Sequence, residues 1–347
     1  MKLRLFIALA LIPQILIVNF LKNNPSVIDT YYVDSFYNGV FKINSFIFSN
    51  INFPIGEVLY IAIFISFIYL VFKTLSFKFK DFLNLISFIS IVYFFFYSFW
   101  GLNYFRTSIS ERLNIKSNYE FVELDFTIEK IISLIEKEIP IIKKEKQISN
   151  IFELIDTKNS NIKESIIPAL FLYQRVSGHF IPFTSEAVVV KEIPLVDIPV
   201  VILHEQAHQM GYADEGEASF IAFTNAIKHK DPSVRYSGYF NALMNLLNEV
   251  VKNHPEKLEF YKNRLDEKVL SDISSVQNFW GKYSNNIFDK ITNFIYDFYL
   301  KSNNQEAGIK SYNKVSNYII DYYQSDQLSK IFNWITIFNK LSSKRNV

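Results

Sequence analysis

The chain of 347 residues has no cysteine, little glycine or proline, and no cluster of positive charge. Without cysteine there is no disulfide and no thiolate ligand for a metal ion. The low numbers of glycines, nine, and prolines, ten, argue against a loop-rich or all-β protein and favour long helices. The formal charge of +2 is spread along the chain, so no electrostatic footprint for nucleic acid is present and we expect no nucleic-acid partner.

Apolar residues, by contrast, make up half of the chain, including 35 Phe and 21 Tyr. Three long apolar runs lie in the first hundred residues, at about 5–21, 57–72 and 82–100. Their length and clustering predict three transmembrane helices and make the lipid bilayer a partner. No small-residue cleavage site follows the first run, so we expect an uncleaved anchor rather than a signal peptide.

The basic residues beside these runs predict their orientation. Five of them fall on one side of the predicted spans: Lys2, Arg4, Lys73, Lys78 and Lys80. The loop on the other side, 22–56, carries only Lys22 and Lys42. The positive-inside rule then places the N-terminus in the cytoplasm. We expect a multi-pass membrane protein with everything after Arg106 extracytoplasmic. In a bacterium with two membranes, the protein would lie in the inner membrane and this part of it in the periplasm.

The remaining sequence predicts a mainly α protein, with a membrane domain at 1–106 and a predominantly helical α+β domain with a small sheet at 107–347. Residues 183–191, with the run Ala187–Val190, predict a strand that forms the edge of a substrate cleft and pairs with an extended peptide. Apolar spacing predicts helices at 33–48, 127–146, 214–229, 234–252, 256–268, 272–302, 306–324 and 327–341.

The central motif is 201–211, Val-Ile-Leu-His-Glu-Gln-Ala-His-Gln-Met-Gly. His204 and His208 are four residues apart, so a helix places them one turn apart on the same face. Two imidazoles held in this way are a pair of nitrogen ligands for tetrahedral Zn²⁺. Glu205 lies beside the first ligand, where its carboxylate can take a proton from a water activated by the metal.

The residues around the motif support a helix. Asp197 can cap its start, Pro199 suits its first turn, and Gly211 can end it in a left-handed conformation. The alternative is a core helix whose histidines form hydrogen bonds in the interior. The chain has only five histidines, and two of them stand here at ligand spacing, which favours the metal site.

A third protein ligand is needed, and three acidic residues compete for the role. Asp214 lies six residues after His208 with a glycine between them, a spacing that turns the chain back toward a metal. Glu215 and Glu217 fall in the predicted first turn of the next helix, where acidic charge is favourable in any case, and Asp214 can cap that helix. Spacing alone leaves all three open.

Residues 215–219, Glu-Gly-Glu-Ala-Ser, resemble the glutamate-zincin arrangement, in which the ligand glutamate stands three residues before a small residue. The resemblance implies that Glu215 is the third ligand, ahead of Glu217 and Asp214. In those enzymes an aspartate usually follows the small residue and orients a ligand histidine. Ser219 stands at that position here.

More widely, the chain is similar to an uncharacterised bacterial family of membrane-anchored proteins inferred to be zinc metallopeptidases, domain-of-unknown-function family 3810. The resemblance implies a zincin-like fold for residues 107–347. It is carried by the metal motif and by the stretches 100–106, 183–186, 236–239, 299–303 and 308–312.

The predicted function is therefore a membrane-anchored zinc metallopeptidase with Glu205 as general base, acting on peptides or proteins in the periplasm or at the membrane surface. Tyr236 and Tyr239 are possible donors to the oxyanion formed when water attacks a carbonyl. As an alternative, lone helical tyrosines are often packing residues.

Two other functions remain open. One is a non-catalytic membrane scaffold that contains zinc, and the other is a zinc amidase acting on cell-wall material. Structural zinc sites usually fill all four positions with protein ligands, often cysteines. The presence of Glu205 and the absence of cysteine therefore favour an enzyme over a scaffold.

Overall fold

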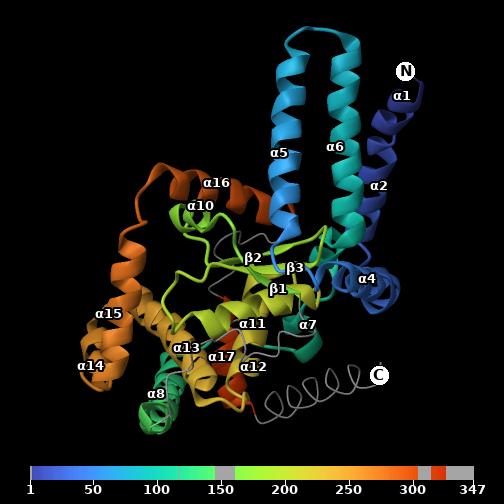
Figure 1. Ribbon diagram of the computed structural model, residues 1–347. Coiled ribbons are helices and arrows are strands. Elements are labelled where there is room, and N and C mark those ends of the chain that lie inside the picture. The colour runs from blue at the N-terminus through green and yellow to red at the C-terminus, as the bar shows by residue number, and fades with distance from the viewer. Residues whose placement is uncertain (1, 117, 145–160, 304–313, 326–347) are drawn as a thin grey trace.

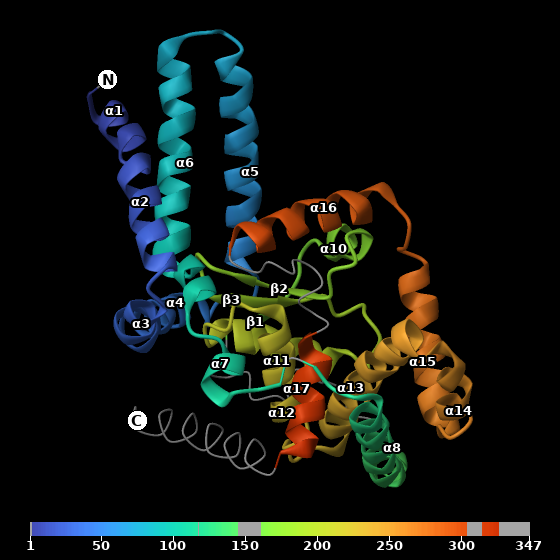
Figure 2. The same cartoon turned by 180° about the vertical axis from the view of Figure 1, so that it is seen from behind.

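A computed structural model describes residues 2–116, 118–144, 161–303 and 314–325 (Figure 1). The protein is mainly helical and has one small sheet of three strands, which confirms the predicted fold class. Long helices project side by side from a body that contains the sheet and the other helices (Figures 1 and 2).

Three helical stretches are long and apolar enough to cross a membrane. The first is Lys2–Lys22, formed by α1 (Lys2–Leu9) and α2 (Leu11–Lys22), and the others are α5 (Ile55–Thr74) and α6 (Phe79–Phe99). The three predicted apolar runs lie within these stretches or end one residue beyond them. The N-terminus and the α5–α6 turn lie together at the end remote from the body (Figure 1).

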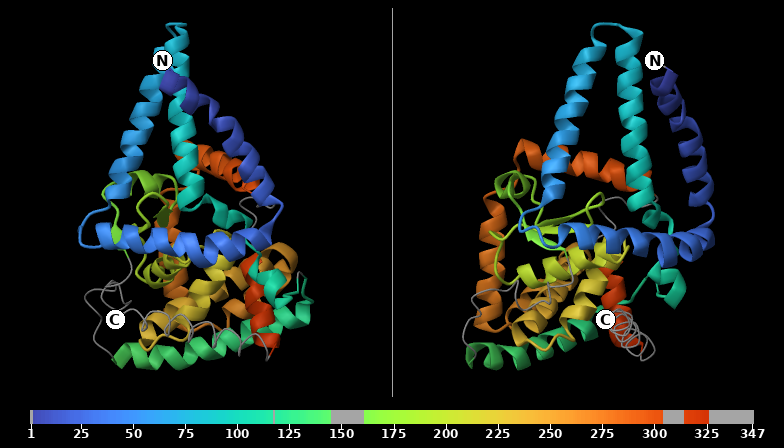
Figure 3. Two further views of the ribbon diagram at one scale, coloured as in Figure 1. Left: turned by 90° about the vertical axis from the view of Figure 1, so that its right-hand side faces the viewer. Right: turned by 45° about the vertical axis from the view of Figure 1, so that its right-hand side comes forward.

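A continuous helical segment crosses the base of these long helices (Figure 3). It consists of α3 (Pro25–Val27), the π-helix η1 (Ile28–Tyr37) and α4 (Asn38–Phe48), so the helix predicted at 33–48 begins earlier. η1 shares a small core with η2 (Gly101–Phe105) and with Ala213. Residues on both sides of the predicted boundary at 106 thus pack together, and that division remains a prediction.

The body is built around α13 (Pro232–Asn253), which packs along α8 (Phe121–Lys144). Both helices carry buried apolar residues at helical spacing, and α17 (Lys314–Gln324) completes this main core. The other helices of the body are α7 (Ile109–Leu113), α10 (Pro168–Tyr173), α11 (Ile198–Gln209), α12 (Glu215–Ala226), η3 (Pro255–Lys257), α14 (Leu258–Lys262), α15 (Glu267–Gly281) and α16 (Ile287–Ser302).

The helix predicted at 272–302 is in fact two helices, α15 and α16. The chain turns at Asn285, which has a φ of 59°, a left-handed conformation that asparagine tolerates. The side chain of Asn286 then accepts a hydrogen bond from the backbone N–H of Asp289 and caps α16. Apolar spacing continues through this break, so periodicity alone misses it.

The segment predicted as one helix at 256–268 is also interrupted. It consists of η3 and α14, and α15 begins at Glu267 with Asp266 as its cap. The helix predicted at 306–324 is described only from Lys314 onward. The helix predicted at 327–341 lies outside the described residues.

The sheet has the order β1–β3–β2, formed by Ile162–Glu164, Glu186–Val189 and Gly178–Ile181. β3 runs parallel to β1 and antiparallel to β2. All of its residues are buried, as expected of a strand covered on both faces. The prediction that this strand forms an exposed edge is therefore wrong, because β1 and β2 occupy the edges.

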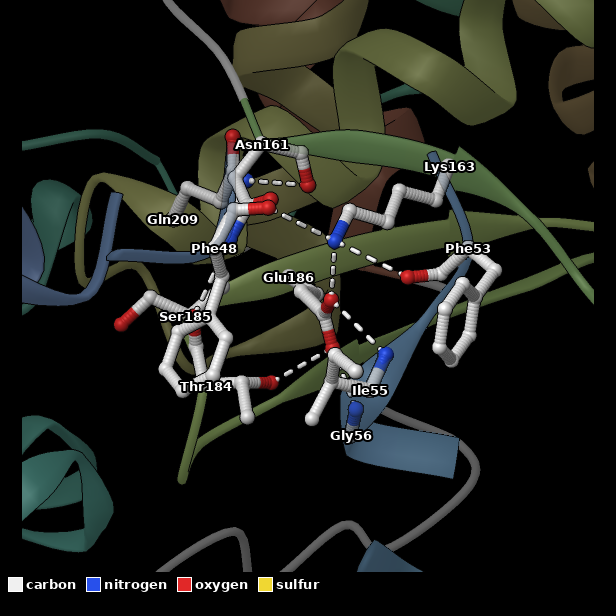
Figure 4. A network of polar contacts seen from close by, with 10 residues as sticks. All are labelled: Phe48, Phe53, Ile55, Gly56, Asn161, Lys163, Thr184, Ser185, Glu186 and Gln209. Carbon is white, nitrogen blue, oxygen red and sulfur yellow. Dashed lines mark hydrogen bonds and ion pairs between the residues drawn. The ribbon is translucent and has the colours of Figure 1, made fainter. Parts of the chain in front are cut away.

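A buried ion pair links Lys163 of β1 to Glu186 of β3, and Glu186 also joins the sheet to α5 (Figure 4). The carboxylate of Glu186 accepts hydrogen bonds from the backbone N–H groups of Ile55 and Gly56, the first residues of α5, and from the Thr184 hydroxyl. A carboxylate at this position satisfies free N–H groups of the helix and complements its dipole.

The same network extends to the other segments that surround the sheet (Figure 4). Lys163 donates to the carbonyl oxygens of Phe48 and Phe53, at 2.9 and 3.1 Å. Gln209, the last residue of α11, donates to the carbonyl oxygen of Ser185 at 3.1 Å. The end of the motif helix, the sheet and the start of α5 are therefore held by one set of polar contacts.

Candidate metal centre

The motif helix α11 begins after Asp197, with Pro199 in its first turn as predicted. Asp197 stands at the predicted position before the helix. Its side chain makes no capping hydrogen bond, so the predicted cap is not formed. Proline is tolerated there because the first N–H groups of a helix have no intrahelical partner.

The helix ends at Gly211, which has a φ of +82° and so confirms the predicted left-handed conformation. The N–H of Tyr212 bonds to the Ala207 carbonyl and that of Gly211 to the His208 carbonyl, the pattern of a Schellman motif. A Cβ atom at Gly211 would lie 2.8 Å from Oδ1 of Asn103. Both conformation and space therefore require glycine.

His204 and His208 lie one turn apart on α11, and α12 brings Glu215 against them. The Nε2 atoms of the two histidines are 3.1 Å apart. Oε2 of Glu215 lies 3.1 Å from Nε2 of His204 and 3.5 Å from Nε2 of His208. One ligand atom from each residue lies within 4.8 Å of the others. Two imidazoles and one carboxylate are the protein donor set of many catalytic zinc sites.

The other nitrogen of each ring has a partner that orients it. Nδ1 of His208 lies 2.6 Å from the carbonyl oxygen of Tyr212, which can only accept, so Nδ1 carries the hydrogen and Nε2 is free to bind a metal. Nδ1 of His204 lies 3.2 Å from the hydroxyl of Ser219. Such partners of ligand histidines set the tautomer and the ring orientation. Ser219, which follows Ala218 on α12, is thus the partner of the His204 ring.

The electrostatics of the cluster suit a cation. Burial lowers the pKa of His208, but the Glu215 carboxylate outweighs this and raises it to about 9. Burial also opposes the charge on Glu215, yet His208 and His204 hold its pKa well below the usual range. The buried Glu215 carboxylate is therefore stabilised in its charged form by neighbouring positive charge. A divalent metal ion can supply that positive charge in place of a proton.

The structure separates the three acidic candidates. Asp214 caps α12 by accepting from the backbone N–H of Glu217 at 3.0 Å, and it pairs with Lys314 at 3.4 Å. Glu217 accepts from the backbone N–H of Ile109, and burial raises its pKa to about 7. Of the three, only Glu215 lies within the histidine cluster.

Glu205 is buried beside the cluster, where burial raises its pKa to about 7. Its carboxylate packs against Gly178 at the start of the edge strand β2, where a Cβ atom would lie 2.8 Å from Oε1. Oε2 has no hydrogen-bond partner within the described parts of the chain. A carboxylate oxygen in this state is available to exchange a proton with a bound molecule.

Residues next to the long apolar helices hold the end of α11, and the sequence analysis did not identify this role. The indole of Trp100 donates to the His208 carbonyl at 3.2 Å, and the Tyr37 hydroxyl donates to the Gln209 carbonyl at 2.8 Å. Arg106 donates to the Gly211 carbonyl at 2.9 Å. These donors satisfy carbonyl groups that the helix end leaves free. The stretch 100–106 was noted only for its resemblance.

Tyr236 and Tyr239 lie in the main core. The Tyr236 hydroxyl donates to Asp272 at 2.6 Å, and the charged groups nearest to Tyr239 include Glu138 and Arg235. No described contact joins either hydroxyl to the histidines, so their predicted oxyanion role has no structural support.

A different tyrosine lies at the cluster. Tyr296 of α16 donates a hydrogen bond to Oε1 of Glu215, and Tyr299 stacks on Tyr296 with ring centroids 6.2 Å apart. Sequence reasoning gave Tyr296 no role and included Tyr299 only in a stretch that carries the resemblance, because both lie far along the chain from the motif. Two tyrosines three residues apart in a helix otherwise rich in Phe and Ile were the available signal.

Comparison with protein-family models matches residues 32–320 to the family described as Protein of unknown function (DUF3810). The chain belongs to this family. The matched range contains the histidine cluster, Glu205 and the segments that hold the end of α11. Searches of curated proteins and of solved structures found no match. The family description assigns no activity, so a functional conclusion depends on the site.

Proposed function

We propose that this member of the family is a membrane-anchored zinc-dependent metallopeptidase whose metal ligands are His204, His208 and Glu215. The observation that carries the proposal is the convergence of one ligand atom from each of these residues within 4.8 Å, beside the buried carboxylate of Glu205. Zinc, when bound, supplies a Lewis acid that polarises a water and the scissile carbonyl.

The chain's own groups do the remaining work. Glu205 accepts a proton from the attacking water at its carboxylate and passes that proton to the leaving amine. The Tyr212 carbonyl and the Ser219 hydroxyl orient the two rings, whose Nε2 atoms would hold the zinc. Tyr296 orients Glu215 through the carboxylate oxygen that faces away from the histidines.

The edge strand β2 supports a peptide as the substrate. β2 pairs with β3 on one side, and its first residue, Gly178, packs against Glu205. Among the described residues no strand pairs with the other side of β2. An extended peptide that added there would gain backbone hydrogen bonds and pass close to the general base. This role replaces the one predicted for Ala187–Val190.

The long apolar helices support an integral membrane location. The five basic residues fall at the end remote from the body, so the positive-inside rule places that end in the cytoplasm and the body outside it. In a bacterial inner membrane the substrates are then peptides or proteins in the periplasm or at the membrane surface.

The test compares the parent chain with Glu205→Gln, both purified full-length in lipid nanodiscs and loaded with zinc. The substitution keeps the shape of the side chain but removes the base. We expect unchanged zinc affinity and complete loss of cleavage of a quenched fluorescent peptide library. Glu192→Gln, the same change at an exposed residue, should retain full activity.

The outcomes separate the three candidate functions. Zinc bound without cleavage of peptides or of purified peptidoglycan fragments by the parent chain would support the scaffold. Cleavage of peptidoglycan fragments alone would support the amidase. Cleavage by Glu205→Gln at the parent rate would refute the mechanism.

A further inference from the structure

Helix α16 turns its apolar face away from the protein. The large apolar side chains on this face are all exposed, with Phe294 at 76% and Phe298 at 69%. The complete face, here called the outer face of α16, is Ile287, Phe288, Ile291, Phe294, Ile295 and Phe298. Their spacing places them on a single side of the helix. A helix packed on a water-soluble protein normally buries such a side.

The opposite side of α16 faces the protein and carries polar contacts together with the buried Leu300. Asp289 is buried and lies 4.0 Å from Arg175. Tyr296 donates to Glu215. The buried Asn303, just after the helix, accepts from the hydroxyl of Tyr97 at 3.0 Å. The helix is therefore amphipathic in the reverse sense, with polar contacts inward and an apolar face outward.

The position of α16 shows what covers its outer face. The helix lies crosswise beside the body-side ends of α5 and α6 (Figures 1 and 3). Its C-terminal end is attached to the last turns of α6, through the Tyr97–Asn303 hydrogen bond and the ring contact between Phe96 and Tyr299. The outer face is thus continuous with the apolar surface of helices long enough to cross a bilayer.

We propose that α16 lies in the plane of the membrane, with its outer face inserted among the lipids of the leaflet on the side of the body. Lys290 and Lys301 are exposed near one border of this face on a helical projection, where their long side chains can reach the head groups, and Lys301 also pairs with Asp297. A helix with this division of residues and this orientation is typical of proteins that lie at the membrane interface. Lipid surrounds the long helices wherever they insert into a membrane. Lipid can therefore cover the outer face of α16 without any additional partner protein.

The membrane contact bears on the candidate metal centre. Tyr296 lies on the face of α16 opposite Phe294 and Phe298, and it holds the carboxylate of Glu215. One helix, about 10–12 Å across with its side chains, separates lipid from that carboxylate. The bilayer thus acts as the outer support of a helix that positions a proposed metal ligand.

The absence of native cysteine allows a direct test with single spin labels. Phe294→Cys and Ile287→Cys place labels at two points of the outer face. Leu270→Cys, an exposed apolar residue of α15, is the matched control. Each full-length variant is reconstituted as one copy per nanodisc of phosphatidylcholine and phosphatidylglycerol, and label relaxation is measured with oxygen and with a water-soluble nickel chelate.

We expect oxygen to relax the labels at 287 and 294 several-fold more effectively than the nickel chelate, and the reverse at 270. Equal access of nickel at 270 and at both outer-face positions would overturn the proposal, because that face would then lie in water. Protection from both reagents would also overturn it, because protein would then cover the face. Nickel access in these one-copy discs, together with protection from both reagents in discs that contain two copies, would overturn the proposal by assigning the face to a second copy of the chain. Agreement between the two outer-face positions excludes a local folding defect in either variant.

Discussion

The two histidine rings of the candidate centre are oriented by different oxygen partners, a backbone carbonyl for His208 and the Ser219 hydroxyl for His204. A carbonyl cannot be removed by substitution, whereas the hydroxyl can. The two contacts therefore differ in how they can be tested, and Ser219 is the informative position.

We predict that Ser219→Ala weakens zinc binding by about 10- to 100-fold, the usual cost of losing a group that orients a ligand. The zinc dissociation constant is measured by competition with a chromophoric chelator. Ser271→Ala, at an exposed position in α15, should bind zinc like the parent. Parent-like affinity in Ser219→Ala would mean that His204 needs no partner at Nδ1.

The third ligand is tested by replacing each acidic candidate in turn. Glu215→Ala removes the carboxylate that meets both histidines, so zinc affinity should fall by more than about 100-fold, beyond the loss of a merely orienting group. Asp214→Ala and Glu217→Ala remove a helix cap and a backbone acceptor and should stay within about tenfold of the parent, as groups outside the ligand set. Loss of zinc in Glu217→Ala with retention in Glu215→Ala would reverse the assignment.

At the scale of elements, two groups of contacts hold the motif helix relative to the long apolar helices. Trp100, Tyr37 and Arg106 bind the carbonyl groups at its C-terminal end. The Glu186–Lys163 pair fixes the first turn of α5 to the sheet. A buried pair of this kind is costly to break, because one partner alone is an uncompensated charge.

Gly56 lies where α5 meets the sheet, and no room is left there for a side chain. A Cβ atom there would lie 2.5 Å from Oγ1 of Thr184 and 2.7 Å from Oε2 of Glu186. We predict that Gly56→Ala destabilises the protein by about 1–3 kcal/mol, the usual effect of overpacking. The midpoint of thermal unfolding, followed in nanodiscs, should fall accordingly.

Gly39→Ala is the control, since no atom lies within 4 Å of a Cβ at that helical position. Alanine is the better helix former, so this variant should be as stable as the parent or more stable by about 0.5–1 kcal/mol. Equal unfolding midpoints for the two variants would show that the junction at Gly56 can relax.

At the scale of the whole molecule, the two ends along the direction of the long helices differ in charge and in content. The five basic residues lie at one end, and the body with the histidine cluster lies at the other (Figure 1). α16 and the segment from α3 to α4 lie crosswise between the two parts (Figure 3). With the long helices in a membrane, this arrangement would bring the candidate centre near the bilayer surface.

Topology is tested by reporter fusion in bacteria. A periplasm-active phosphatase fused after Arg106 should be active, because the charge asymmetry predicts that the body lies outside the cytoplasm. The same reporter inserted at Lys78, in the α5–α6 turn, should be inactive. The opposite pattern would place the body, and any catalysis, in the cytoplasm.

Local sequence determined the features that depend on neighbouring residues. The three long apolar helices, the motif helix with its paired histidines, and its end at Gly211 follow from composition, spacing and one left-handed glycine. Each involves residues within a few turns of one another. For that reason residue types and their periodicity were sufficient.

Tertiary structure decided what depends on contacts between distant segments. Glu215 and Glu217 stand on either side of one helix, and only the packing of α12 on α11 directs Glu215 to the histidines. The position of β3 inside the sheet depends on strands that precede it by up to two dozen residues. Tyr296 reaches Glu215 across 81 positions of sequence. Such contacts leave no local periodicity, because chain folding rather than residue spacing brings the partners together.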